Sequence, residues 1–227
     1  WLKDSGMKFG LLHDEAAQMA LTLHNYTLSG SCYKVRLLLE FLQVDYHTKS
    51  VDFFPGKEHK TPEFLALNPL GQIPVLEDGA LQLRDAQAIL CYLARKYDTS
   101  AQYLPDDPAA FGQVMMWLAF AGNELMAASA ARLHDVLGYA LNVENARAQA
   151  QSAFAILDDH LAERAILGKI WIVGEAPTIA DIACFPYIAL SGDGGIGHEP
   201  YPYLRNWMRA FRKLPRFHAM SGIPEFA

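Results

Sequence analysis

The spacing of hydrophobic and polar positions divides the first half of the chain into short, alternating elements. Residues 20–24 alternate like a β-strand, and the apolar positions within residues 31–42 recur at the three- and four-residue spacing of a helix. Residues 44–51 predict a second strand, residues 62–67 a short helix, and residues 84–97 a helix with an apolar face. This alternation is typical of an α/β domain.

Residues 68–79, with the sequence Asn-Pro-Leu-Gly-Gln-Ile-Pro-Val-Leu-Glu-Asp-Gly, precede the last of these helices. Pro69 and Gly71 predict a chain reversal, and an apolar strand follows. Because a proline cannot donate to a sheet ladder, Pro74 indicates an edge strand or a cis Ile73–Pro74 bond, and we predict the cis bond. The closing Asp-Gly pair predicts a hairpin turn, which makes the order β-α-β-α-β-β-α.

The second half of the chain has no strand pattern. Residues 99–108 are rich in Thr, Ser, Pro and Asp, and predict a linker between a domain of residues 19–98 and a domain of residues 109–227. Residues 109–136 predict one long helix and residues 145–167 a second. The expected fold class is α/β plus all-α: an N-terminal thioredoxin-like domain followed by a C-terminal helical bundle.

Composition and charge narrow the possible partners. The chain has 227 residues, of which 52% are hydrophobic and 19% charged, a globular composition. A formal net charge of −6 without long Lys or Arg runs disfavours nucleic acid and anionic membranes. We expect no apolar run to reach the roughly 18 residues of a membrane span. Three widely spaced cysteines indicate reduced thiols in a cytoplasmic protein rather than a disulfide framework.

Residues 1–18 differ in pattern from the rest of the chain. Their Leu11-Leu12 pair is too short for the core of a signal peptide. We interpret residues 1–18 as a leader or tag-like extension, or as a mis-called start, and expect the native chain to begin at Met19.

Residues 27–32, Thr-Leu-Ser-Gly-Ser-Cys, join the first strand to the first helix. Unpaired N–H groups and the positive end of the helix dipole converge at such a junction, so an anion, and a thiolate in particular, is stabilised there. Thioredoxin-like redox proteins carry Cys-x-x-Cys at this place, whereas this chain has Ser29-x-x-Cys32. It cannot run an intramolecular dithiol cycle, but a serine hydroxyl can bind the sulfur of another molecule. The alternative is that Ser29 or Ser31 only caps the helix.

Residues 178–181, Thr-Ile-Ala-Asp, form an N-capping box ahead of an apolar helix. Preceded by residues 171–177, this box resembles the buried capping box in the helical domain of the glutathione S-transferases. With the Ser-rich junction, the stretch of residues 68–79 and the acidic Asp85 at a helix start, it makes the chain resemble that family from residue 20 to about residue 217.

The resemblance implies that Ser29 is the catalytic residue, supplying the hydroxyl that hydrogen-bonds the glutathione sulfur in serine-type members. Tyr26 is a second choice, because other members use a tyrosine at the end of the first strand. Ser31 and Cys32 also stay open as sulfur contacts. In thioredoxin-like folds the cis-proline lies beside the start of the first helix, so we expect Pro74 next to Ser29.

The resemblance also implies a set of glutathione-binding residues. The backbone of Ile73, held extended by the following proline, would pair with the peptide-like ligand. Asp85 and Ala86 fall where the family usually has an acidic residue and a serine that hold the γ-glutamyl group. Ala86 departs from that pattern and removes one hydroxyl contact. The expected set comprises His59, Lys60, Gln72, Ile73, Pro74, Asp85 and Ala86.

The expected electrophile pocket comprises Tyr26, Leu28, Trp117, Phe120 and Arg132. An aromatic stripe on a helix is more often core than pocket, so a core role for Trp117 and Phe120 is the alternative. Arg132 would attract an anionic cosubstrate if its helix faces the cleft. The histidines and cysteines show no spacing typical of a metal site, so we expect no metal.

The expected function is glutathione transfer: the protein activates the thiol of its cosubstrate glutathione for attack on a small electrophile. The alternatives are a non-catalytic glutathione-transferase-like binding or assembly module, and a glutathione-dependent disulfide reductase, which Cys32 keeps open. The sequence does not identify the electrophile. We also expect a homodimer, because an α/β half joined to a helical half exposes apolar faces such as that near Cys91 and Tyr92.

Overall fold

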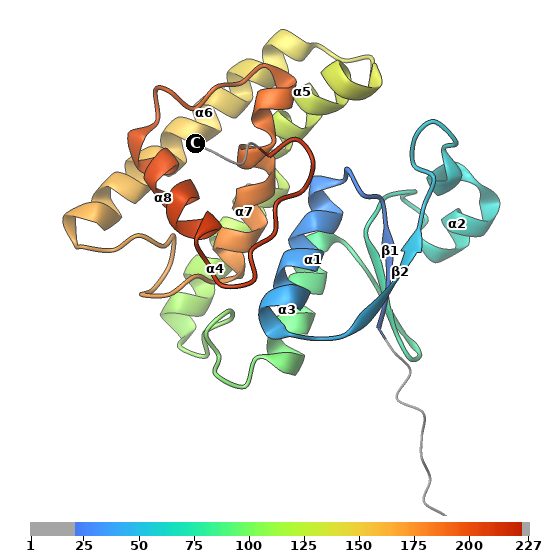
Figure 1. The fold of residues 1–227 in the computed structure, drawn as a ribbon, viewed down its shortest axis with the longest axis horizontal. Helices are drawn as coiled ribbons and strands as arrows, with labels where there is room; N and C mark the ends of the chain where they lie inside the picture. The colour runs from blue at the N-terminus through green and yellow to red at the C-terminus, as the bar shows by residue number, and fades with distance from the viewer. Residues whose placement is uncertain (1–20, 224–227) are drawn as a thin grey trace, which may run out of the picture.

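The computed structural model describes residues 21–223, which form an α/β part and a helical part (Figure 1). The predicted leader of residues 1–18, the expected start at Met19 and the first residue of the predicted strand, Ala20, lie outside the described residues. The first part comprises β1 (Leu21–Asn25), α1 (Gly30–Leu42), β2 (Tyr46–Ser50), the 3₁₀ helix η1 (Glu58–Lys60), α2 (Pro62–Leu67), β3 (Val75–Asp78), β4 (Leu81–Arg84) and α3 (Ala86–Tyr97). The second comprises α4 (Pro108–Gly122), α5 (Met126–Leu137), α6 (Val143–Ile166), α7 (Ile179–Ala189), the 3₁₀ helix η2 (Ser191–Gly194) and α8 (Pro202–Arg212).

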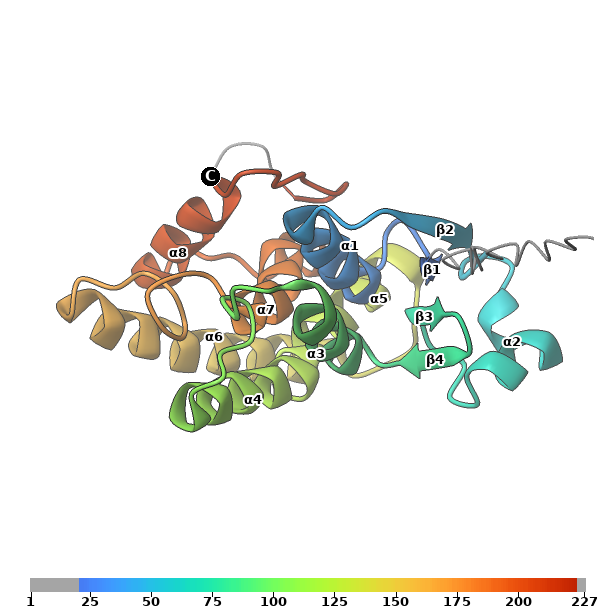
Figure 2. The ribbon, with the colours of Figure 1, turned by 90° about the horizontal axis from the view of Figure 1, so that it is seen from below.

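The four strands form one mixed sheet in the order β2-β1-β3-β4. β1 pairs with β2 in parallel and with β3 antiparallel, so that Leu23 lies between Thr48 and Leu76. α1 and α3 lie on the side of the sheet that faces the helical part, and α2 lies on the other side (Figures 1 and 2). The α/β part is therefore thioredoxin-like, and the helical part completes the fold class that the sequence predicts.

The stretch of residues 68–79 takes the predicted form. The Ile73–Pro74 peptide bond is cis, and Gly71 has a φ of +56°. A Cβ at Gly71 would lie 2.7 Å from the carbonyl oxygen of His59, so the turn requires glycine for both its conformation and its space. β3 begins directly after Pro74, and β3 and β4 form the predicted hairpin.

The predicted single helix over residues 109–136 is wrong, because the chain breaks between α4 and α5. Gly122 and Asn123, at the break, are weak helix formers. The Asn123 backbone N–H ends α4 with a hydrogen bond of 3.0 Å to the Ala119 carbonyl. Leu125, which follows, is completely buried. The break therefore brings an apolar side chain into the core and changes the direction of the chain between α4 and α5.

The apolar segment that contains this break also corrects one expectation. Residues Pro108–Leu137 are long and apolar enough to pass a length and composition test for a membrane span, although we expected no such run. The structure divides them into α4 and α5 and buries part of the segment inside the protein. The core helices of soluble proteins pass the same test, so packing in the helical part accounts for the apolar composition.

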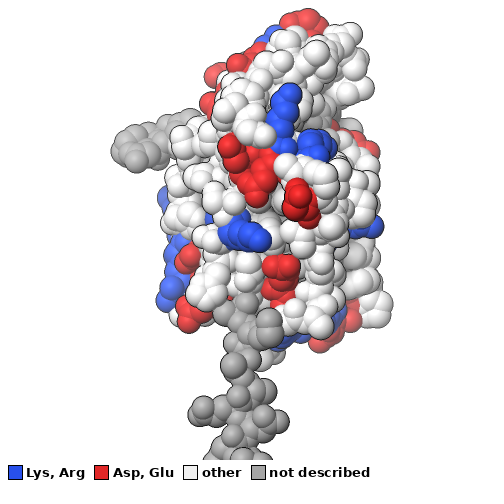
Figure 3. Space-filling model, turned by 90° about the vertical axis from the view of Figure 1, so that its right-hand side faces the viewer, with Lys and Arg blue, Asp and Glu red and all other residues white. Residues whose placement is uncertain are grey.

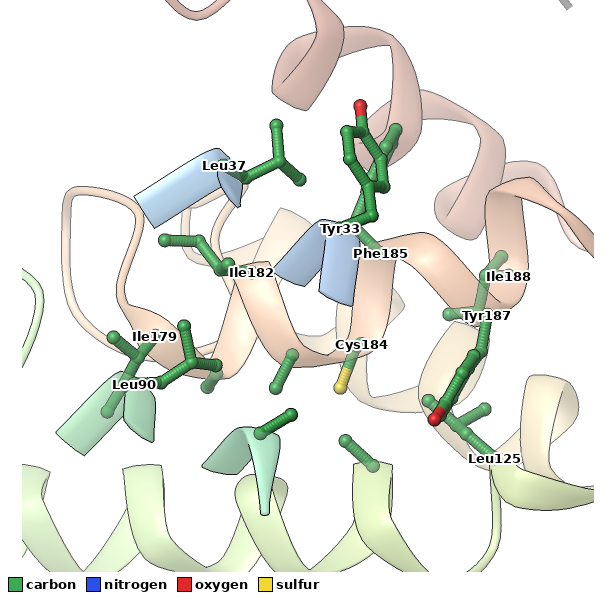
Figure 4. Close-up of a cluster of buried hydrophobic side chains, with 14 of the residues drawn as sticks. Tyr33, Leu37, Leu90, Leu125, Ile179, Ile182, Cys184, Phe185, Tyr187 and Ile188 are labelled. Carbon is green, nitrogen blue, oxygen red and sulfur yellow. The ribbon is translucent and has the colours of Figure 1, made fainter. Parts of the chain in front are cut away.

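α7 lies at the centre of the hydrophobic core. All 11 of its residues, Ile179–Ala189, are buried, and the helix packs against α1, α3 and α4. Figure 4 shows Tyr33 and Leu37 of α1 and Leu90 of α3 around the same helix as Phe185. One continuous apolar cluster thus joins the two parts, and side chains of α7 reach the start of α1.

The predicted capping box at the start of α7 is confirmed. The buried Asp181 carboxylate accepts hydrogen bonds from the backbone N–H groups of Thr178 at 2.8 Å and Ile172 at 3.0 Å. It accepts a third from Nε1 of Trp207 at 2.8 Å. Burial raises the pKa of Asp181, and these donors oppose that effect. The box therefore stabilises the helix that positions the cavity wall.

Candidate active site

A cavity of about 430 Å³ lies between the α/β part and the helical part. The start of α1, the cis-proline loop and the start of α3 line one side, and α5 and α7 line the other. All of the expected glutathione-binding residues line it: His59, Lys60, Gln72, Ile73, Pro74, Asp85 and Ala86. Four further expected residues line it as well: Tyr26, Leu28, Ser29 and Arg132. The structure thus brings segments that are distant in sequence to one site.

Ser29 is the N-cap of α1. Its backbone is extended, and its Oγ accepts a hydrogen bond of 3.2 Å from the backbone N–H of Cys32. Ser29 therefore caps the helix, and this cap does not exclude a role in binding. A hydroxyl oxygen that accepts one hydrogen bond still has its own proton to donate. Ser29 is also partly exposed in the cavity, so the cap and a contact to a ligand sulfur are compatible.

Ser31 lines the same end of the cavity and is paired with a residue of the helical part. Its Oγ lies 2.5 Å from the hydroxyl of Tyr187 on α7. Burial raises the pKa of Tyr187 to about 12, so the phenol is neutral. Tyr187 was not among the predicted site residues, because a tyrosine within an apolar helix carries no local signal of a site. Only the packing of α7 on α1 places it here.

Cys32 points away from the cavity. Its side chain is completely buried, and its Sγ lies 3.9 Å from the carbonyl oxygen of His24 in β1. Burial raises the pKa of the Cys32 thiol, which keeps it protonated. Cys32 is therefore not placed to contact the ligand sulfur or to form a mixed disulfide.

Hydrogen bonds to the backbone hold the cis-proline loop in place. The buried Asn68 donates from Nδ2 to the Gln72 carbonyl at 2.7 Å and accepts from the Leu70 N–H at 3.1 Å. Lys60 donates from Nζ to the Gly71 carbonyl at 2.9 Å. Because an ammonium has three protons, Lys60 can bind this loop and a ligand carboxylate together.

His59 forms part of an aromatic stack at the cavity. The centroid of its ring lies 4.0 Å from that of Phe53, and the centroid of the Phe53 ring lies 5.5 Å from that of Tyr26. Burial, followed by the charges of Lys60 and Lys57, lowers the pKa of His59. His59 is therefore neutral at pH 7, and Lys60 is the better cation for a carboxylate. Phe53 is a lining residue that the sequence analysis missed.

Asp85 is the N-cap of α3 and has a φ of +79°, an unusual value for a residue other than glycine. Its Oδ1 accepts a hydrogen bond of 3.0 Å from the Ala88 N–H, and the residue is exposed and lines the cavity. Ala86, the first residue of α3, is buried and presents no hydroxyl. The helix start can therefore bind an amino acid group through the Asp85 carboxylate and its free N–H groups.

Arg132 lines the cavity but is not a free cation. Its Nε donates to the Asp193 carboxylate at 3.0 Å, and its Nη1 donates to the Leu28 carbonyl at 2.8 Å. These bonds connect α5 to the loop before α1 and to η2. Its helix therefore faces the cavity, but the guanidinium is paired with Asp193 and positions the Leu28 loop; attraction of an anionic cosubstrate by Arg132 stays a prediction.

Trp117 and Phe120 do not line the cavity, which corrects the expected electrophile pocket. Trp117 is only 4% exposed, and its ring centroid lies 5.0 Å from that of Phe120 and 4.6 Å from that of His160. The aromatic stripe is core, as the alternative held, because this face of α4 packs into the helical part. The apolar wall instead comes from α5 and the residues that follow it: Met126, Leu133, Val136, Leu137 and Tyr139.

At the α2 end of the molecule, the charged side chains of the described surface are of both signs. Figure 3 shows Lys and Arg interspersed with Asp and Glu there, on a face that is mostly uncharged. Among residues 21–223, no group of three or more His, Cys, Asp or Glu side chains is placed to hold a metal ion. The site is thus built from hydroxyls, backbone groups and single charges.

Comparison with known proteins shows what this fold and site correspond to. The family described as "Glutathione S-transferase, N-terminal domain" matches residues 19–95, and "Glutathione S-transferase, C-terminal domain" matches residues 140–210. Glutathione S-transferase 2 of Anopheles gambiae is 31% identical over 88% of this chain and 96% of its own length. Glutathione S-transferase 1 of Dianthus caryophyllus is 30% identical over 87% and 89%. The disulfide-bond oxidoreductase YfcG of Escherichia coli (strain K12) is 28% identical over 81% and 86%.

Solved structures agree with these relatives. A glutathione S-transferase from Pseudomonas fluorescens superposes with a TM-score of 0.80 at 29% identity, covering 89% of this chain and 99% of that one. Ure2p in complex with glutathione superposes with a TM-score of 0.79 at 28% identity, covering 88% and 96%. This chain therefore belongs to the glutathione S-transferase family, and the family and the cavity together support glutathione transfer as its activity.

Proposed function

We propose that this protein transfers glutathione to a small apolar electrophile and that Ser29 activates the thiol. The observation that carries the proposal is the convergence of three elements on one cavity. These are the Ser29-capped start of α1, the turn at Ile73–Pro74, and the Asp85-capped start of α3. Each offers the kind of group that one part of glutathione needs.

In the proposed complex the γ-glutamyl ammonium binds the Asp85 carboxylate, and its carboxylate binds the backbone N–H groups at the start of α3. The cysteinyl backbone pairs with Ile73, as a short added strand. The glycyl carboxylate binds Lys60, with the neutral His59 beside it. This arrangement leaves the sulfur at the start of α1, next to Ser29.

The Ser29 hydroxyl then donates a hydrogen bond to the sulfur. Such a bond strengthens as the sulfur becomes anionic, so it lowers the pKa of the bound thiol. The thiol proton leaves to solvent, and the thiolate attacks the electrophile. A carbon–sulfur bond forms, and in a substitution the leaving group departs with its electron pair. Positioning and electrostatics supply the rate, and no covalent enzyme intermediate is needed.

The α5 wall supports an apolar electrophile. Met126 and Val136 are exposed by 41% and 43% although both are hydrophobic, and both face the cavity. A ligand pocket is commonly apolar, with a few fixed polar groups. An electrophile held on α5 would therefore lie against the sulfur that is bound at α1.

Calorimetric titration with glutathione, followed by turnover of an activated aryl chloride, tests the proposal. We expect saturable binding and formation of the thioether. A protein that binds glutathione but makes no thioether with any electrophile tried would favour the binding or assembly module. A protein that does not bind glutathione would contradict both.

The similarity to YfcG supports a second candidate, a glutathione-dependent disulfide reductase. The burial of Cys32 means that such an activity would use the glutathione thiol and not a protein thiol. If the protein reduces a small mixed disulfide and Cys32→Ala reduces it equally well, the result supports this second candidate function. Loss of that activity in Cys32→Ala would contradict the geometry described above.

We also propose a homodimer located in the cytoplasm. Phe111 and Met116 of α4 are exposed by 38% and 57%, and Leu81 of β4 by 39%. Cys91 and Tyr92 on α3, near which the sequence predicts an interface, are only partly buried. The three cysteines are free, which suits a reducing compartment. Light scattering at micromolar concentration tests the dimer, and a stable monomer would contradict it.

A further inference from the structure

Lys34 on α1 is a buried cation that the proposed reaction does not yet use. Its side chain is completely buried, and its Nζ has no hydrogen-bond partner. Fully buried lysines are rare, because removing an unpaired ammonium from water is costly. An apolar residue at this position would avoid that cost, so the presence of lysine calls for a functional explanation.

The nearest feature to the ammonium is Tyr187. The Lys34 Nζ lies 3.7 Å from the centroid of its ring, a cation–π contact. A Cβ at Gly30 would approach the same ring to 3.1 Å, and Ser31 contacts its hydroxyl at 2.5 Å. The first turn of α1 therefore surrounds Tyr187 with Gly30, Ser31 and Lys34, and both hydroxyls of this group line the thiol end of the cavity.

Few titratable groups surround the Lys34 ammonium and change its pKa. α7 presents the Tyr187 phenol and the Cys184 thiol toward it, and Asp85 acts on it from the start of α3. Burial lowers the pKa of Lys34 to about 7, and the charge of Asp85 opposes that shift. Burial also raises the pKa of Cys184, so that thiol stays neutral. Lys34 is therefore the group of this cluster whose charge changes near neutral pH.

We propose that Lys34 is a positioning residue for glutathione activation: its ammonium, stacked on Tyr187, holds the Tyr187 hydroxyl against Ser31 and adds positive potential at the thiol end of the cavity. The proposal rests on the proposed function, because it concerns the same bound thiol. Lys34 does not touch the ligand. It acts through Tyr187 and Ser31 and through its charge, in a region where low dielectric strengthens electrostatic effects.

This role has a defined pH dependence. As pH rises, ionisation of the bound thiol increases the rate. Above about pH 7, Lys34 loses its proton and the potential that favours the thiolate declines with it. Because loss of the ammonium raises the pKa of the bound thiol, the rate of the wild type should rise with pH over a wider range than a single ionisation spans.

The test measures the pKa of the glutathione thiol in the enzyme complex, from the ultraviolet absorbance of the thiolate, together with kcat and the KM for glutathione. In Lys34→Met we expect the thiol pKa measured below pH 7, where Lys34 is charged in the wild type, to rise by about one unit, and kcat at about pH 6 to fall up to about tenfold, with KM near wild type. Lys34→Arg, whose charge is permanent, should retain kcat and show a rate that rises with pH as a single ionisation. Lys213→Met, an exposed lysine after α8, is the control and should match wild type.

Two further results separate the possible failures. Lys34→Met should melt at or above the wild-type temperature, because it removes a buried unpaired charge. A folded Lys34→Met with the wild-type thiol pKa and kcat overturns the proposal, as does a folded Lys34→Arg that keeps the broadened pH profile of the wild type. A wild-type protein that does not bind glutathione overturns the proposed function and this inference together, whereas normal wild-type turnover with unchanged variants overturns only the inference.

Discussion

The two sides of the cavity are built in different ways. The side that we propose binds glutathione consists of backbone turns and helix starts, each of which requires a particular residue: Ser29 as N-cap, Gly71 at positive φ, and a cis Ile73–Pro74 bond. The α5 side consists of apolar side chains on a regular helix, such as Leu133 and Val136. The first kind of wall leaves a motif in the sequence, and the second does not, because many apolar residues can cover a helix face.

The same difference separates what each side can do. Backbone N–H groups, a carboxylate and hydroxyls recognise a fixed polar ligand with directional bonds. An apolar wall contributes area and shape, which distinguish ligands weakly. We therefore expect substitutions on the glutathione side to have large and specific effects, and substitutions on α5 to have small effects on one substrate only.

The largest effect is expected for Ser29→Ala. Removing the donor should raise the pH midpoint of activity and lower the rate at pH 7 by about tenfold to a hundredfold, while glutathione affinity stays near wild type. A pH–rate profile checks this. Loss of the N-cap should also cost about 1 kcal/mol of stability, which thermal unfolding measures.

Ser29→Thr, which keeps a hydroxyl, is the matched control. Ser31→Ala and Cys32→Ala belong in the same series. If Ser29→Ala keeps the wild-type rate and profile while Ser31→Ala does not, the sulfur contact lies at Ser31. If all three alanine variants keep them, the backbone N–H groups alone stabilise the thiolate.

Asp85→Asn should raise the KM for glutathione about tenfold with little change in kcat. Asparagine is also a good N-cap and tolerates positive φ, so the variant removes the charge and keeps the helix start. A contact far from the sulfur stabilises ground state and transition state alike, so its loss changes KM alone. An unchanged KM for glutathione would show that Asp85 serves only as a helix cap.

Ala86→Ser should improve glutathione binding. It restores the hydroxyl that the family pattern has at this position, and a hydrogen bond to a charged group contributes about 1.5 to 3 kcal/mol. Ala86 is 4% exposed, so part of that gain is lost in fitting the hydroxyl. We expect a KM for glutathione about three- to tenfold lower, measured by steady-state kinetics. A KM that rises would mean that the site has no space for the oxygen.

The smallest effect is expected on α5. Val136→Ala should raise the KM for an apolar electrophile about two- to fivefold and leave the KM for glutathione unchanged. Ile166→Ala, at the exposed end of α6 and 84% exposed, is the control and should change neither. If Val136→Ala changed the KM for the electrophile and the KM for glutathione equally, the two walls would not have separate roles.

Local chemistry made part of this site predictable. The Pro-Gly turn, the cis-proline position, the Asp-Gly hairpin and the Thr178–Asp181 box are patterns within a few residues, and each has the predicted form. The break between α4 and α5 was not predictable from apolar spacing, because the periodicity continues through Gly122 and Asn123. Packing of Leu125 into the core decides where the chain turns.

The sequence by itself determined the thioredoxin-like half and the helical half, because these depend on local conformational preferences, and its resemblance to a family supplied the residues of the proposed glutathione wall. Only the tertiary structure decided that Trp117 is core, that Arg132 is paired with Asp193, and that Lys34 lies on the ring of Tyr187. Periodicity shows that a helix face is apolar but not which neighbour covers it. That choice depends on how α7 packs between the two halves, and it joins residues that are more than a hundred positions apart in the sequence.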